Sequence, residues 1–335
     1  MLLPMLVPES SPPPAHALGH IVWGTDSSTT WKYDAPCFQT GLPTANEKTG
    51  WRLDWIERTE HPATHIQYTQ APVHIEWKNA QHYGFGLATL PASANIAQDT
   101  LQAYSTVLAL IKKQGFPHIL RTWHYLPNIH AKEQGLERYR QFNIGRQNAY
   151  QAAGLHAQSP FPAASVLGCT ERAFWKMAFI AARSPGIAIE NPKQTSAFHY
   201  PNAYGRTPPL FSRALNHRTA QHELLLISGT ASISGHQSMH IGNVYAQAGL
   251  MLDNIQTLLQ SANIHSRRKN LPPFQIERLV PLCYVRHKED AAGVQDYLQK
   301  RLKTQHCPVV IADVCREDLL VEIEACGTLN FSLPL

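Results

Sequence analysis

Two glutamates near the C-terminus, Glu322 and Glu324, are the residues whose type and spacing most strongly suggest chemistry. The apolar alternation around them predicts a strand over residues 319–325, in which side chains two positions apart share one face. Because the inner face of a half-buried strand is normally apolar, a carboxyl group that points inward loses hydration and its pKa rises. Such a group can act as a general acid near neutral pH.

Arginines that could bind an anionic substrate occur in two places. The segment 135–146 contains three of them and a tyrosine: Arg138, Tyr139, Arg140 and Arg146. If this segment is helical, Tyr139 and Arg146 share a face, and Gly145 would let another surface approach closely. The alternative is a solvated helix in which Glu137 pairs with the arginines. Arg213 is a second candidate, and arginine suits carboxylates because it binds them with two hydrogen bonds.

Secondary-structure elements that would position these residues occur in a repeated order. In the second half, strands are predicted at 223–228, 230–235, 277–286, 309–314 and 319–325, with helices at 244–262 and 291–303. In the first half, strands are predicted at 65–70, 73–77, 83–90, 119–126, 163–167 and 173–181, with helices at 98–114 and 133–153. The order β-β-α-β-α-β-β is common to both halves, which indicates a duplication.

A constant offset of 146 positions aligns Cys169–Lys176 with Cys315–Glu322, so Lys176 takes the place of Glu322 in the first copy. Between the copies, residues 184–211 show no regular period. They form either a plain linker or a loop over a cleft, and Tyr200, Tyr204 and Arg206 favour the loop.

Composition excludes several classes of function. The net charge of +5 is spread along 335 residues, which suits a small acidic substrate better than a nucleic acid. No apolar run is long enough to span a membrane, and the proline-rich residues 1–16 are expected to form a loose leader. Six cysteines without paired spacing indicate reduced thiols and a cytoplasmic protein. Two histidine pairs, His16 with His20 and His236 with His240, show no third ligand, and no nucleotide fingerprint is present, so we expect neither metal nor cofactor.

Six segments carry a family resemblance: RTWHYLPNI (121–129), GLERYRQFNIGR (135–146), FPAASVLG (161–168), HYPNAYGR (199–206), SGTASISGHQS (228–238) and VCREDLLVEIE (314–324). Together they resemble the chorismatase family, whose members cleave the enolpyruvyl ether of chorismate. The likeness extends from about residue 17 to 327. Residues 228–235, 246–259 and 321–324 also resemble the RidA/YjgF domain.

These resemblances imply an α+β fold of two tandem RidA/chorismate-mutase-like domains, with mixed sheets and helices packed on one face. The expected parts are a leader at 1–16, a degenerate domain at 17–183, a connecting loop over the cleft at 184–212, and a domain at 213–335 that carries the catalytic glutamate. The protein would be a monomer, because two fused copies can pair internally, or a small homo-oligomer.

The resemblance also implies roles for individual residues. Glu322 would protonate the enolpyruvyl methylene carbon, and Cys315 matches the cysteine of family members that form an aromatic product. The turn between them would put both on adjacent strands facing one cleft, whereas the alternative for Cys315 is a buried core thiol. The residues expected to bind the dicarboxylate substrate are Tyr139, Arg146, Arg213, Tyr204 and Arg206, with Ala231 shaping the pocket floor and Gln247 as a further polar contact.

The expected products are pyruvate and 3-hydroxybenzoate, with some 4-hydroxybenzoate. One alternative is hydrolysis to a dihydroxycyclohexadiene carboxylate. Another is a RidA-like hydrolase of enamines or imines, but the arginine of the RidA pattern, fifteen residues before the glutamate, is replaced here by Cys307. A third alternative is a protein that binds an aromatic acid without turnover.

Overall fold

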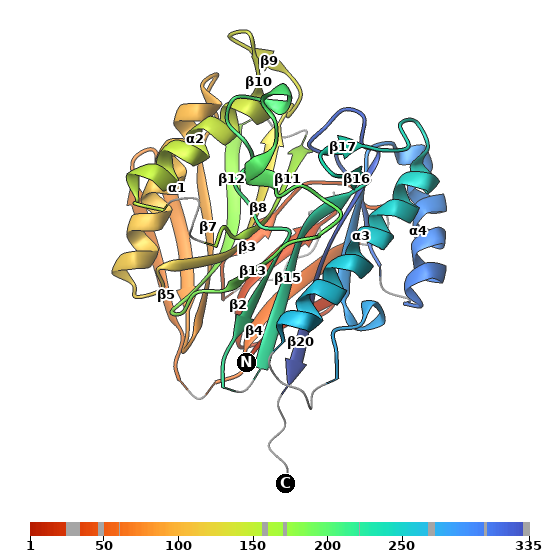
Figure 1. Ribbon diagram of the computed structural model, residues 1–335. Helices are drawn as coiled ribbons and strands as arrows, with labels where there is room; N and C mark the ends of the chain where they lie inside the picture. Colours follow the sequence, from red (N-terminus) through yellow and green to blue (C-terminus); the bar gives the residue numbers. More distant parts are fainter. Residues whose placement is uncertain are drawn as a thin grey trace.

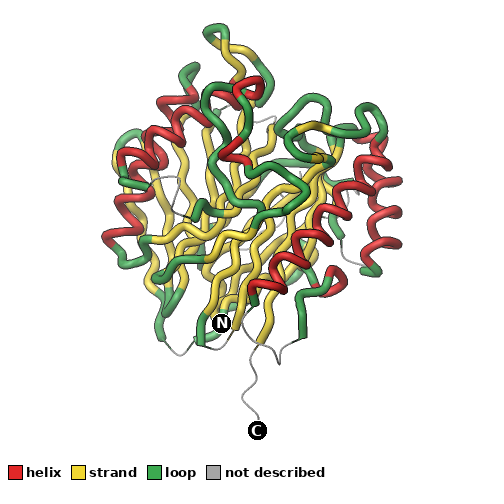
Figure 2. Tube along the Cα trace, in the orientation of Figure 1, coloured by secondary structure: helices red, strands yellow, loops and turns green. Residues whose placement is uncertain are grey.

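Three β-sheets pack around a common core, and two pairs of helices cover the outside (Figure 1). The computed structural model describes residues 1–24, 34–45, 50–59, 61–155, 160–169, 173–220, 222–266, 272–304 and 307–330. In Figure 2 the strands occupy the middle of the molecule and the helices lie on its two flanks. The fold is therefore α+β, with mixed sheets, as predicted.

The first six-stranded sheet has the order β11-β8-β12-β7-β6-β5. Its strands are β5 (Thr64–Gln70), β6 (Val73–Asn79), β7 (Tyr83–Pro91), β8 (His118–Pro127), β11 (Ala163–Cys169) and β12 (Phe174–Ala182). Helices α1 (Ile96–Lys113) and α2 (Arg138–Ala152) cover one face, where Tyr104, Val107 and Phe142 pack on apolar side chains of the sheet.

The second six-stranded sheet has the order β13-β14-β15-β20-β18-β19. Its strands are β13 (Ile187–Ile189), β14 (Ala214–Arg218), β15 (His222–Ala231), β18 (Val280–Val285), β19 (Val309–Ile311) and β20 (Val321–Asn330). Helices α3 (Val244–His265) and α4 (Lys288–Leu302) cover its outer face. Short elements complete the half: β16 (Ile233–Ser234), β17 (Gln237–Ser238) and the 3₁₀ turn η3 (Ile276–Arg278).

The two sheets repeat the same topology, with β12 and β20 in equivalent central positions. Lys176 of β12 is in register with Tyr125 of β8, and Glu322 of β20 is in register with Tyr284 of β18. The hydroxyl groups of Tyr125 and Tyr284 lie 3.0 Å apart where the sheets meet face to face. The topology thus repeats as the duplication predicted, whereas the domain boundaries stay predictions.

Residues 2–8 form a strand, which corrects the prediction of a loose leader. β1 (Leu2–Pro8) pairs with β4 (Trp51–Glu57) in a third sheet of order β1-β4-β2-β3, together with β2 (Ala17–Trp23) and β3 (Cys37–Gln39). Pro4 and Pro8 are tolerated because β1 lies at the edge of the sheet, where a missing N–H costs little. Side chains of this third sheet, such as Trp23 and Trp55, join the core between the other two.

Alternation along β20 separates the helix-covered face from the interior. Ile323 and Ala325 pack against α3 and α4, so Glu322 and Glu324 point to the opposite face. That face meets the first sheet, where Glu324 contacts Trp123. Both carboxyl groups therefore point inward, as the sequence pattern suggested.

Three local predictions were wrong. The strands predicted at 223–228 and 230–235 are one strand, β15, with a β-bulge between Ile227 and Thr230. Helix α2 begins at Arg138 and not at residue 133, because a tight hairpin of β9 (Lys132–Glu133) and β10 (Leu136–Glu137) precedes it. Gln134 and Gly135 have positive φ there, which a helix does not allow. Strands β19 and β20 are not neighbours, because β18 lies between them and pairs parallel to β19. Cys315 therefore lies in the connection between β19 and β20 and not on a strand adjacent to β20.

Candidate active site

A cavity of about 490 Å³ lies where the two halves of the chain meet. This volume is in the range of small-molecule binding sites. It is lined by residues from both halves: His130, Lys132, Glu137, Tyr139, Arg140, Tyr200, Ala203, Tyr204, Pro209, Phe211, Arg213, Gly229, Ala231, Ile233, Cys315, Arg316, Glu317, Asp318 and Glu322. Six of the nine predicted site residues are among them.

Glu322 is the carboxyl group of this cavity that is placed to act as an acid. It is in register with Ala231 of β15, beside a β-bulge between Ile227 and Thr230. Gly229 lies in the bulge, and a Cβ atom on it would come within 2.0 Å of Glu322 Oε1. Burial, followed by the charge of Glu324, raises the pKa of Glu322 to about 8, although Arg121 and Arg213 act in the opposite direction. Glu322 is therefore mostly protonated at neutral pH.

Cys315 lines the same cavity from the turn before β20. Burial, together with the negative charge of Glu322, raises the pKa of the thiol to about 12. The thiol is thus neutral at physiological pH and is a weak hydrogen-bond donor rather than a nucleophile.

Two arginines of the cavity, Arg213 and Arg316, pack against aromatic rings. The guanidinium group of Arg316 lies 4.0 Å from the ring centroid of Tyr204 and 5.1 Å from that of Tyr200. Arg213 donates a 2.6 Å hydrogen bond to the Tyr200 hydroxyl and lies 5.3 Å from the Phe211 ring centroid. Within the described part of the chain, Arg213 Nε and one terminal nitrogen of Arg316 have no hydrogen-bond partner. Each guanidinium group therefore keeps an N–H that a substrate carboxylate could accept from.

The segment between the two copies contributes directly to this arrangement. Besides β13 it contains two 3₁₀ turns, η1 (Ala197–His199) and η2 (Asn202–Tyr204), which carry the chain past the cavity. Tyr200, Tyr204 and Phe211 of this segment line the cavity. In Figure 1 it runs from the middle of the molecule, where β13 is labelled, to the upper part near β11 and β16.

Three predicted residues lie outside the cavity lining. Arg206 is exposed to solvent. Gln247 is fully buried in α3, where its amide donates to the Asp318 carbonyl and accepts from the Leu320 N–H, so it fixes the turn that carries Cys315. The sequence showed that both residues are polar, but not that one is exposed and the other buried.

Arg146 is the third, and it lies beneath the cavity wall. It is 1% exposed, donates to the Asn143 side chain and lies 4.9 Å from the Phe142 ring centroid. Asn143 in turn bonds to Tyr139, which does line the cavity. Gly145 was expected to allow a close approach, and the surface that approaches is α1: a Cβ atom at this position would come within 2.2 Å of the Ala97 carbonyl oxygen.

Both the sequence and the fold of this chain are similar to those of known proteins. Residues 59–181 match the family model described as the N-terminal part of FkbO/Hyg5-like chorismatases. A chorismatase from Streptomyces rapamycinicus is 36% identical over 257 residues, which cover 75% of this chain and 76% of that protein. This chain belongs to the chorismatase family.

Further members of the chorismatase family agree with this result. A 3-hydroxybenzoate synthase from Streptomyces hygroscopicus is 32% identical over 81% of this chain and 83% of that protein. A chorismatase crystal structure at 1.08 Å resolution superposes with a TM-score of 0.85 at 29% identity, covering 98% of each chain. The fold therefore matches that of a chorismatase along nearly the whole chain.

Two functional features of this chorismatase-family site were missed from the sequence. Arg316 follows Cys315 directly, and its position next to a candidate site residue in a polar turn was the signal that could have found it. Glu324 was left without a role, yet it is bonded to Arg121, Trp123 and Ser165 of the first half. The sequence pattern showed that Glu324 shares the inward face with Glu322, but it could not show contacts between segments that are far apart in the chain.

Among the described residues, no three histidine, cysteine, aspartate or glutamate side chains come together as a metal-binding group. Nor is any helix there both long and apolar enough to cross a membrane.

Proposed function

We propose that this protein cleaves the enolpyruvyl ether of chorismate and releases pyruvate and a hydroxybenzoate. Family membership supports an enzyme of this class. The observation that carries the proposal is a buried carboxyl group, Glu322, whose pKa is raised to about 8, in a cavity that also contains Arg213 and Arg316. An acid beside two cations suits a dianionic substrate that reacts by protonation.

In the first step Glu322 transfers its proton to the methylene carbon of the enolpyruvyl group. The π electrons of the vinyl ether form the new C–H bond, and an oxocarbenium ion results. The carboxylate left on Glu322 stabilises this cation electrostatically in a site of low dielectric constant. This chemistry requires neither a redox cofactor nor a metal.

The oxocarbenium ion then has two fates. If the neighbouring ring hydroxyl displaces the side chain, its oxygen bonds to the ring carbon as the ether C–O bond breaks, pyruvate leaves, and the hydroxyl proton returns to Glu322. The resulting epoxide then opens at one C–O bond, a ring proton is transferred to its oxygen, and the ring becomes aromatic. Chorismate is then divided into pyruvate and a hydroxybenzoate without net consumption of water. If water attacks instead, one water molecule is consumed and a dihydroxycyclohexadiene carboxylate is formed.

Arg213 and Arg316 are the proposed ligands of the two substrate carboxylates, with Tyr139 and Tyr204 completing the walls. Arginines close to an acid normally lower its pKa, and Arg213 does so for Glu322. Burial and the Glu324 charge outweigh that effect. Glu322 can thus stay protonated in a cavity that attracts anions.

We favour 3-hydroxybenzoate as the main aromatic product, with some 4-hydroxybenzoate. Cys315 resembles the cysteine found in aromatising members of the family, and its neutral thiol is close enough to Glu322 for the two to interact electrostatically. A neutral donor there can orient a ring hydroxyl, and the small Ala231 leaves room beside it.

A RidA-like hydrolysis of enamines or imines is the second candidate, because it would use the same glutamate. The position of the RidA arginine is Cys307 in this chain, and Cys307 is buried among the apolar side chains beneath α3 and α4. It cannot bind a substrate carboxylate, which favours chorismate.

The test is incubation of the purified protein with chorismate, without added cofactor. Pyruvate is measured enzymatically and the aromatic products are separated by chromatography. We expect pyruvate and 3-hydroxybenzoate in equal amounts, and a Glu322→Gln variant slower by at least about a hundredfold. Near wild-type turnover by Glu322→Gln would remove the acid assignment, and no turnover of chorismate by the wild type would remove the function.

Cys315→Ala separates the two fates of the intermediate. Loss of the thiol should shift the product ratio towards the dihydroxycyclohexadiene acid or 4-hydroxybenzoate, whereas pyruvate release continues. An unchanged product spectrum would leave Cys315 as a packing residue. The cytoplasmic location and the monomeric or small oligomeric state stay predictions.

A further inference from the structure

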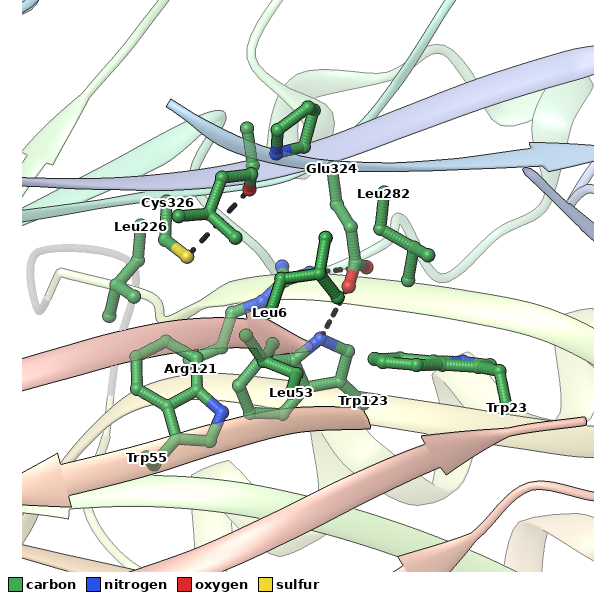
Figure 3. Close-up of a pocket in the computed structure, with 13 residues that line it drawn as sticks. Leu6, Trp23, Leu53, Trp55, Arg121, Trp123, Leu226, Leu282, Glu324 and Cys326 are labelled. Carbon is green, nitrogen blue, oxygen red and sulfur yellow. Dashed lines mark hydrogen bonds and ion pairs between the residues drawn. The ribbon is translucent and has the colours of Figure 1, made fainter. Parts of the chain in front are cut away.

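Glu324 is the second inward-facing carboxyl group of β20, and it is 4% exposed. Its carboxylate accepts hydrogen bonds from Arg121 (2.7 Å), Trp123 (2.8 Å) and Ser165 (2.5 Å). All three donors belong to β8 and β11 of the other half of the chain. Figure 3 shows Glu324 pointing from its strand toward Trp123 and Arg121, with the two interactions drawn as dashed lines.

The direction of each hydrogen bond can be derived from this network. Ser165 Oγ accepts from Arg121 at 2.6 Å and from the Gly229 N–H at 3.1 Å, which leaves its own proton for Glu324. The indole of Trp123 and the guanidinium of Arg121 can only donate. Glu324 therefore acts solely as an acceptor, which is the role of an ionised carboxylate.

Solvent does not screen this charge effectively. The cavity next to Glu324 measures about 20 Å³ and is walled by apolar residues that include Trp23, Trp55 and Leu282. That space holds about one water molecule and excludes a ligand. A carboxylate in such surroundings acts on its neighbours over a longer range than a surface charge does.

Glu322 lies two residues away on the same face, so the two carboxyl groups are separated by about 6–7 Å along the strand. The titratable and charged groups that act on or face Glu322 come from several elements: Glu324 on β20, Arg121 on β8, Cys283 and Tyr284 on β18, Arg213 before β14, and Cys315 and Arg316 in the turn. Glu137, Glu317 and Asp318 also line the cavity, but Glu324 is the carboxylate whose charge raises the pKa of Glu322.

We propose that Glu324 is a positioning residue whose fixed negative charge keeps Glu322 in its acid form. If Glu322 ionised, a second carboxylate would lie beside that of Glu324 on the buried face of β20, so the neutral form of Glu322 is favoured. Glu324 is the largest influence on the pKa of Glu322 after burial, and its effect exceeds the opposing effect of Arg121. The value of this arrangement to the enzyme rests on the proposed function of Glu322 as an acid.

The same network also holds Glu322 in place. Ser165 binds Glu324 and the Gly229 N–H, and the Cα of Gly229 lies against the Glu322 carboxyl group. Glu324 and Gly229, which set the charge and the geometry of the acid, are thus both held by residues of the first half of the chain. That half has Lys176 in place of a glutamate of its own.

The test measures the titration of Glu322 directly in the substrate-free protein, by carboxyl ¹³C NMR with Glu322→Gln to assign the signal. Glu324→Gln should lower the apparent pKa of Glu322 by roughly one to two units, from the Coulomb energy at this separation. Glu324→Asp keeps the charge and should stay close to the wild type. The exposed Glu277→Gln, which removes the same charge elsewhere, should leave the titration unchanged.

The pH dependence of kcat/KM with chorismate provides a second readout. The high-pH limb should move to lower pH in Glu324→Gln and remain in place in Glu324→Asp. If Glu324→Gln does not fold, the double variant Arg121→Gln/Glu324→Gln removes the ion pair without leaving an unpaired charge. The pKa of Glu322 in this double variant should still lie below that in the wild type.

The proposal would be overturned if the folded glutamine variants showed the same pKa for Glu322 as the wild type. So would equal shifts in Glu324→Gln and Glu324→Asp, which would indicate a packing effect. The NMR titration needs no turnover, so a wild-type protein that fails to cleave chorismate would refute the proposed function and leave this inference to be decided separately.

Discussion

Replacement of Glu322 by glutamine should make the protein more stable at alkaline pH. The pKa of Glu322 is raised from 4.5 to about 8 in the folded protein. A group whose pKa is raised by folding contributes its full stability below the unfolded pKa and loses it as the pH rises through the folded pKa. Wild-type stability should therefore decline between about pH 4.5 and 8 because of this residue.

The magnitude follows from the shift, at about 1.4 kcal/mol for each pKa unit. Over the whole interval the loss is on the order of 5 kcal/mol, a large part of the stability of an ordinary domain. Glutamine does not ionise, so Glu322→Gln escapes this loss. The free energy of unfolding of the variant, relative to that of the wild type, should therefore increase as the pH rises. This difference should become constant above about pH 8.

The assay is urea unfolding of both proteins in buffers from about pH 5 to 9. Other titrating groups are common to the two proteins and cancel in the difference. Glu277→Gln serves as the control, because it removes a carboxyl group from an exposed position. If the difference between Glu322→Gln and the wild type does not grow with pH beyond that of Glu277→Gln, Glu322 is not neutral in the folded state and the acid mechanism fails.

Three further outcomes are expected. Gly229→Ala should displace the Glu322 carboxyl group and reduce kcat about a hundredfold without unfolding the protein, as checked by circular dichroism. Acid should destabilise the protein below about pH 6.5, because burial lowers the pKa of His217 to about 4 and that of His222 to about 3, so that unfolding takes up protons. Urea unfolding between pH 7 and 5 should show this loss of stability, and the loss per pH unit should be smaller in His217→Gln. Gln247→Leu should cost about 1–3 kcal/mol in urea unfolding, because the Leu320 N–H loses its partner, and should leave the high-pH limb of kcat/KM in place.

Much of the fold could be predicted because the two halves have strong local periodicity. The offset that aligned Lys176 with Glu322 matches the register of β12 and β20. Pairing between β19 and β20 was predicted wrongly, because neighbouring strands in sequence usually pair and nothing local reveals that β18 lies between them. The prolines of β1 argued against a strand, and only the edge position, a property of the whole sheet, makes them acceptable.

The site was predictable where residue type and family resemblance agreed. Glu322, Cys315, Tyr139, Tyr204, Arg213 and Ala231 all line one cavity. Arg146 and Gln247 are polar residues that the fold buries in supporting networks, and burial against a distant segment has no signature in a single sequence. For the same reason the partners of Glu324, about two hundred positions earlier in the chain, could not be foreseen.

The equivalence of Lys176 and Glu322 has a consequence for how such a site can evolve. In an assembly of identical chains every substitution appears in all copies at once, so a residue needed for catalysis cannot be exchanged in one of them. Once two copies share one polypeptide, each position can change alone. The first copy could then lose its acid and supply Arg121, Trp123 and Ser165 to the second, a division of labour open only to a covalently joined pair.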